Sequence, residues 1–172
     1  MAAMTTTPER TDPPLIADER TMLDTWLDFH RDTLAFKCAD LDDEQLRTAS
    51  VPPSGLTLLG LVRHMAEVER GWFRNALAGE EAAPLYYTEE DPDGEFHDLD
   101  KADTAEAFAT WRAEIAHARE LALGRSLDDI GLGRRKNPVS LRWIYIHMIE
   151  EYARHNGHAD LIRECVDGVT GD

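Results

Sequence analysis

Cysteine is almost absent from this chain of 172 residues, in which only Cys38 and Cys165 occur, far apart in sequence. Two isolated cysteines exclude a disulfide framework and a zinc site built from thiolates. They fit a reducing compartment, so we expect a cytoplasmic protein.

Basic residues are also scarce. The sequence has 18 lysines and arginines against 34 aspartates and glutamates, which gives a formal net charge of −16. A surface this acidic repels phosphates, so we expect no binding to nucleic acid and none to anionic membranes. No apolar run reaches the length of a membrane span. Residues 1–7 lack a basic region followed by an apolar one, so we expect no secretory signal.

Glycine-rich phosphate loops, short repeats and alternating strand patterns are missing as well, whereas helical periodicity is abundant. Apolar residues three or four positions apart predict long helices in four segments, at about 16–36, 56–77, 104–123 and 138–166. A short helical turn is expected at 40–47, and Pro138 suits the first turn of the last helix.

These four amphipathic segments predict an all-α fold, an antiparallel four-helix bundle. We expect a single domain over residues 15–168, preceded by a disordered tail at residues 1–14, which have little to bury.

Residues 79–103 interrupt the helical pattern. Ten acidic residues accompany a single lysine, Lys101, and Pro84, Pro92 and Gly94 oppose regular structure. We expect a long loop, in which the charge run is more simply a solvated surface than a functional lid.

The last predicted helix carries the most unusual pattern, because His147, Glu151 and His155 lie four residues apart and share one helix face. The same face carries Ile144 and Met148, so it should point into a core. A buried carboxylate without a partner is costly, and a divalent metal would satisfy the carboxylate and the imidazoles together.

The second long helix contains a single histidine, His64, close to its apolar stripe. With Glu151 and His155 it supplies two imidazoles and one carboxylate. Catalytic zinc, iron and nickel sites use such a set and keep a position open for water or substrate. The alternative is an internal polar network without a metal.

Other polar residues could support this set. His147 could be a fourth ligand or contact a ligand, and His158 could face the entrance of the site. Ligating histidines usually donate their second ring N–H to a carboxylate or carbonyl, and Glu67 or Asp160 could accept it. For both additional histidines the alternative is an imidazole satisfied by backbone or water.

Two segments, LVRHMAEVERGWF at 61–73 and IEEYARHNGHADL at 149–161, resemble the DinB/YfiT-like superfamily, and more narrowly its actinobacterial branch of DinB-like "mini-circle" proteins. The resemblance extends from about residue 18 to residue 165. It implies a four-helix bundle that holds a divalent metal by three side chains. Most members use three histidines, whereas the mycothiol-dependent maleylpyruvate isomerases use a His, Glu, His set around zinc.

His64, Glu151 and His155 match that second set position by position. The resemblance therefore implies a metal-dependent S-transferase or isomerase that acts on a small electrophile, with mycothiol as co-substrate. Zinc is the favoured metal, with nickel and iron as alternatives. A metal of this kind would lower the pKa of a bound thiol and hold it as a thiolate. A homodimer is also typical of the family.

The one basic cluster, Arg134-Arg135-Lys136, could bind a carboxylate of the thiol or the substrate, although a solvated loop is the simpler interpretation. Tyr145 and Tyr152 could donate protons, or only pack. Two other functions stay open: a metal-dependent hydrolase, and a non-enzymatic stress or binding protein in which the metal stabilises the bundle.

Overall fold

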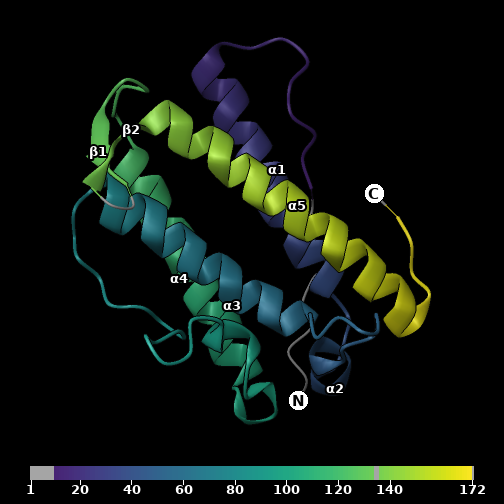
Figure 1. Ribbon diagram of the computed structural model, residues 1–172. Coiled ribbons are helices and arrows are strands. Elements are labelled where there is room, and N and C mark those ends of the chain that lie inside the picture. Colours follow the sequence, from purple (N-terminus) through teal and green to yellow (C-terminus); the bar gives the residue numbers. More distant parts are fainter. Residues whose placement is uncertain (1–9, 134–135, 172) are drawn as a thin grey trace. The chain divides into compact units, whose positions relative to one another are not determined.

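The computed structural model describes residues 10–133 and 136–171, most of which are helical (Figure 1). In chain order the elements are α1 (Glu19–Cys38), α2 (Asp43–Arg47), α3 (Leu58–Glu69), η1 (Arg70–Leu77), η2 (Gly94–Phe96), η3 (Leu99–Lys101), α4 (Thr104–Ala122), β1 (Ile130–Leu132), β2 (Pro138–Ser140) and α5 (Leu141–Asp167). The predicted all-α class is confirmed. Among the described residues, no helix combines the length and the hydropathy that a bilayer crossing requires.

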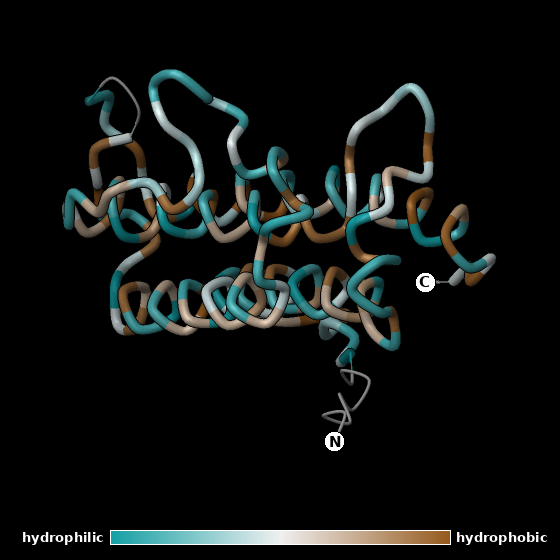
Figure 2. The backbone as a smooth tube through the Cα atoms, turned by 90° about the horizontal axis from the view of Figure 1, so that it is seen from below, coloured by the Kyte–Doolittle hydropathy of each residue, from teal (hydrophilic) through white to brown (hydrophobic). Residues whose placement is uncertain are grey.

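The chain divides into two compact units, one made of residues up to 58 and from 149 onward, the other of residues 59–148. Both divisions fall inside helices, since α3 begins at Leu58 and α5 runs without a break through Met148 and Ile149. Hydrophobic and hydrophilic positions alternate along the helices in short stretches, as amphipathic helices require (Figure 2).

In the first unit, α1 begins where the Asp18 carboxylate accepts a hydrogen bond from the backbone N–H of Thr21 at 3.0 Å. This cap explains why α1 starts three residues later than the periodicity predicts. At its other end, the Arg163 guanidinium of α5 donates to the carbonyl oxygens of Lys37 and Ala39 at 3.1 and 2.7 Å. The last carbonyls of α1, which lack helical partners, are thereby satisfied.

In the second unit, α3 continues directly into η1, a π-helix of eight residues. The predicted helix up to about residue 77 is therefore confirmed in extent, whereas its last two turns differ in type. Periodicity does not predict a π-helix, because the same apolar residues suit either form of helix. The core of the second unit includes these buried side chains: Leu59, Leu61, Val62, Met65, Phe73, Trp111, Ile115, Leu141, Ile144 and Met148.

A short antiparallel hairpin precedes α5, with Ile130 opposite Ser140 and Leu132 opposite Pro138. The sequence predicted no strand there, and strands of three residues are too short to show an alternating pattern. A Cβ on Gly131 would lie 2.1 Å from the Ala76 carbonyl oxygen, so only glycine fits where β1 lies against η1.

The prediction that Pro138 lies in the first turn of the last helix is wrong. Pro138 belongs to β2, and α5 begins three residues later at Leu141. The Ser140 hydroxyl accepts from the backbone N–H of Trp143 at 3.2 Å, which satisfies one of the first amides of the helix.

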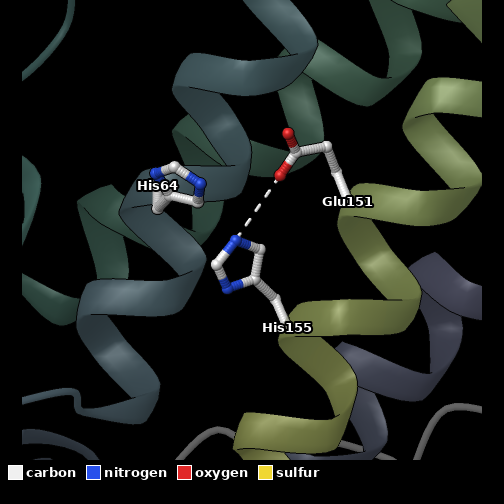
Figure 3. A group of neighbouring side chains, drawn as sticks. All are labelled: His64, Glu151 and His155. Carbon is white, nitrogen blue, oxygen red and sulfur yellow. Dashed lines mark ion pairs between the residues drawn. The ribbon is translucent and has the colours of Figure 1, made fainter. Parts of the chain in front are cut away.

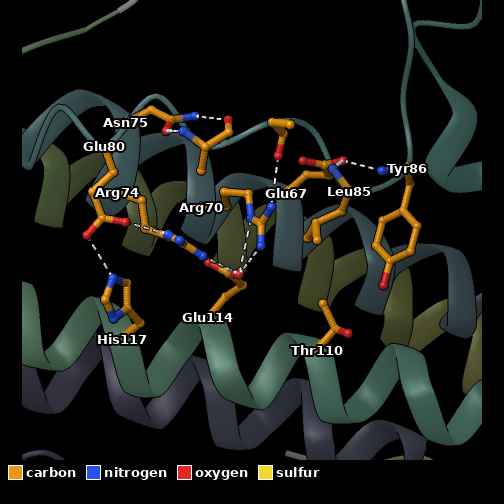
Figure 4. A network of polar contacts seen from close by, with 12 residues as sticks. Glu67, Arg70, Arg74, Asn75, Glu80, Leu85, Tyr86, Thr110, Glu114 and His117 are labelled. Atoms are coloured by element: carbon orange, nitrogen blue, oxygen red, sulfur yellow. Dashed lines mark hydrogen bonds and ion pairs between the residues drawn. The ribbon is translucent and has the colours of Figure 1, made fainter.

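A charged network joins η1 to α4 within the second unit (Figure 4). Oε1 of Glu114 accepts from Nε and Nη2 of Arg70 at 3.1 and 2.6 Å, and from Nη1 of Arg74 at 3.2 Å. Arg70 also donates to the Ala83 carbonyl at 2.8 Å, so the network fixes the start of the acidic loop as well.

Candidate functional site

Glu151 and His155 lie one turn apart on α5, with Oε2 of the carboxylate 3.5 Å from Nε2 of the imidazole (Figure 3). Their side chains are 20% and 12% exposed, so neither group is fully surrounded by water. The uninterrupted helix keeps residues four apart on one face, as the sequence predicted. A carboxylate oxygen and an imidazole nitrogen are therefore held near each other on this face of α5.

His158 lies against this pair. Its Nδ1 is 3.3 Å from Nδ1 of His155, and the two rings meet edge to face. Burial lowers the pKa of His158, and the charges of His155 and Arg154 act in the same direction. The neutral imidazole is the form that can accept a hydrogen bond or bind a metal. The predicted place of His158 at a site entrance stays a prediction.

His64 lies on α3, in the other unit, and contacts the acidic loop. Its Nδ1 is 2.9 Å from Oε1 of Glu95, and its ring stacks on Phe96 with 5.3 Å between centroids. Burial acts to raise the pKa of Glu95, but the His64 hydrogen bond, a backbone N–H and the charge of Arg63 outweigh it and lower the pKa. An ionised carboxylate only accepts, so Nδ1 of His64 carries the hydrogen of this bond.

Glu95 was missed by the sequence analysis, which described the acidic loop as solvated surface. Its side chain is only 8% exposed, so that description is wrong for this residue. The available signal was the run Gly94-Glu95-Phe96, where a glycine and an aromatic interrupt the charges. Gly94 is itself buried, and a Cβ there would lie 2.4 Å from the Tyr86 carbonyl oxygen.

Glu67 and Asp160, the carboxylates suggested as partners of ligating histidines, have other contacts. Oε1 of Glu67 accepts from the backbone N–H groups of Leu85 and Tyr86, both at 2.6 Å (Figure 4). Burial raises the pKa of Glu67 despite these bonds. Asp160 pairs with Nζ of Lys37 at 2.7 Å. The role suggested for them stays a prediction.

His147 is packed among aromatic rings. Its centroid lies 4.8 Å from those of Trp72 and Trp143, stacked on Trp143 and edge to face with Trp72. It also belongs to a second group on α5 that could hold a cation, since single ligand atoms of His147, Glu150 and Glu151 lie within 4.8 Å of one another.

The two tyrosines and the basic cluster complete the predicted set. Tyr145 and Tyr152 are 4% and 0% exposed, and the ring of Tyr145 packs edge to face on Phe73, which favours packing over proton donation. Arg134 and Arg135 lie outside the residues that the structure describes.

No curated protein matches this chain. A family model described as mycothiol-S-transferase matches residues 22–168, a range that contains every helix from α3 to α5 and nearly all of α1. His64, Glu151 and His155 all lie within the match. The chain therefore belongs to the mycothiol S-transferase family, within the DinB-like superfamily.

Proposed function

We propose that this protein is a metal-dependent mycothiol S-transferase, which joins the sulfur of mycothiol to a small electrophile. The observation that carries the proposal is the half-buried pair of Glu151 and His155, 3.5 Å apart on α5, in a chain of this family. A carboxylate and an imidazole at that separation are suited to bind the same divalent ion.

His64 is proposed as the third ligand, through Nε2. The resulting set of two imidazoles and one carboxylate suits zinc, nickel or iron, and zinc is favoured. The alternative group on α5 is less suited, because Glu150 is exposed and pairs with Arg154 at 2.6 Å. Water and the Arg154 guanidinium would compete with any cation for the Glu150 carboxylate.

The finer architecture is also a proposal: α1, α3, α4 and α5 form an antiparallel four-helix bundle in one domain over residues 15–168. The chain passes between its two units inside α3 and α5. Domain boundaries usually fall in exposed linkers. Because both divisions lie inside helices instead, they favour a single domain. Bundles build metal sites from side chains of facing helices, which is what the proposed ligands require.

In the proposed reaction the thiolate sulfur attacks an electrophilic carbon. A carbon–sulfur bond forms, the leaving group departs with its bonding electrons, and the thiol proton passes to water. A bound divalent ion supplies the low thiol pKa that this step needs. The contribution of the chain is to hold the Glu151 and His155 donors in a partly water-excluded setting on α5.

The aromatic group of Trp72, Trp143 and His147 is the proposed contact surface for the electrophile. His147 is one helical turn before Glu151 on α5, and Trp143 is 47% exposed. Aromatic rings in reach of solvent offer apolar area and stacking to a small ligand.

The proposal is tested with full-length protein, zinc, mycothiol and monochlorobimane. We expect thiol-dependent formation of the fluorescent conjugate with release of one chloride per product. His155→Ala should abolish it, whereas His97→Ala, which removes an exposed imidazole, should not. A metal-loaded wild type that forms no conjugate would contradict the transferase function. Ester or amide cleavage without thiol would favour the hydrolase instead.

A further inference from the structure

We infer that Glu95, in the acidic loop, is a positioning residue that sets the tautomer and orientation of His64 for metal binding. The inference rests on the proposed function, because it concerns one of the proposed ligands. It gives a role to a loop that the sequence presents only as a run of charge.

The first support is the geometry of the His64 ring, which is held from two sides. Oε1 of Glu95 lies 2.9 Å from Nδ1, and Phe96, the next residue, stacks on the ring at an interplanar angle of 28°. The carboxylate restricts rotation of the ring by a directional bond, and the aromatic restricts it by contact. Both restraints come from one short turn, so they act together.

The second support is that the burial of Glu95 is costly for folding. Glu95 as a whole residue is 6% exposed, and its Oε2 has no hydrogen-bond partner among the described residues. A buried carboxylate with one oxygen unpaired destabilises a fold, so stability alone does not account for its position. A carboxylate that accepts from a metal-bound imidazole is a recurrent feature of metal sites.

The turn that carries Glu95 is anchored without it. The Arg63 guanidinium donates to the carbonyl oxygens of Gly94 and His97 at 3.3 and 3.1 Å, and lies 4.3 Å from the centroid of the Tyr86 ring. Replacing the Glu95 side chain should therefore leave the turn in place. This makes Glu95 variants informative about His64 rather than about loop folding.

The decisive experiment measures zinc and cobalt(II) affinity of full-length wild type, Glu95→Ala, Glu95→Gln and the control Glu90→Gln, an exposed acid of the same loop. We expect Glu95→Ala to weaken binding about 10- to 100-fold. Glu95→Gln should weaken it less, because its amide oxygen still accepts, and Glu90→Gln should match wild type. The absorption of bound cobalt(II) should change in the Glu95 variants only.

A second readout needs no metal. The ¹⁵N shifts of His64 in the metal-free protein should show hydrogen on Nδ1 in wild type and a mixture of tautomers in Glu95→Ala. Wild type that binds neither ion overturns the proposed function, and the inference with it. Wild type that binds while Glu95→Ala binds within twofold of it overturns the inference alone. Unchanged His64 shifts in Glu95→Ala also overturn it.

Discussion

Oε2 of Glu151 lies 3.5 Å from Nε2 of His155, one helical turn further along α5. Both side chains are partly exposed, and a carboxylate–imidazole pair in reach of water contributes little to folding by itself. A cation shared by both groups would change that, and the change is measurable as stability.

Zinc should stabilise wild type but not Glu151→Gln. At a zinc concentration of 100 times the dissociation constant, linkage predicts a gain of about 2.7 kcal/mol in the free energy of unfolding. The amide of Glu151→Gln keeps the size of the side chain and removes the charge. Urea unfolding with and without zinc checks this, with Glu164→Gln, an exposed glutamate of α5, as the control. Equal gains in Glu151→Gln and wild type would contradict Glu151 as a ligand.

Glu114→Gln should destabilise the protein by about 3 kcal/mol, because Arg70 and Arg74 would lose the anion that they share. Glu114 is 5% exposed, so water cannot replace it. Glu120→Gln, on the same helix and 78% exposed, should cost less than about 1 kcal/mol. Denaturant midpoints of the two variants give the comparison, and similar midpoints would show that the network does not stabilise the fold.

Two glycines should respond to alanine in opposite directions. Gly94→Ala places a Cβ against the Tyr86 carbonyl oxygen and should destabilise by about 1–3 kcal/mol. Gly157 lies in α5, and a Cβ added there would have nothing within 4 Å. Gly157→Ala should therefore raise the free energy of unfolding by about 0.5–1 kcal/mol. Thermal unfolding measures both. A stabilised Gly94→Ala would argue against the tight turn.

The two cysteines should differ in reactivity. Burial raises the pKa of the Cys38 thiol to about 12, against a small opposite effect of Arg163, so this thiol stays protonated and inaccessible at neutral pH. Cys165 is exposed. We expect native protein to react with one equivalent of Ellman's reagent, and Cys165→Ser with none until denaturant is added. Rapid reaction of native Cys165→Ser would contradict the burial of Cys38.

His97 should titrate above the ordinary histidine pKa of 6.5, because Asp91 accepts a hydrogen bond from its ring and attracts its positive charge. A raised pKa means that the protonated form favours the folded state. Its contribution is present in full below pH 6.5 and is lost as pH rises through the folded value. NMR titration should show the raised pKa in wild type and a return toward 6.5 in Asp91→Asn. An unchanged pKa in that variant would exclude Asp91 as the cause.

Much of the fold follows from local pattern. The apolar residues that recur every three or four positions predicted α1, the continuous α3 and η1, α4 and α5 to within a few residues. A helix brings only such positions onto one face. The same geometry predicted that Glu151 and His155 are neighbours, since residues four apart on a continuous helix must be. The two segments at 61–73 and 149–161 predicted the superfamily.

Other features required the folded chain. The contact between His64 and Glu95 joins residues 31 positions apart, and periodicity reports nothing about pairs in different elements. The π-helix η1 and the three-residue strands β1 and β2 likewise have no signal in the hydrophobic periodicity. By itself the sequence determined which residues share a helix face. Only the tertiary structure decided which loop carboxylate is buried against His64, because burial depends on contacts between segments remote in sequence.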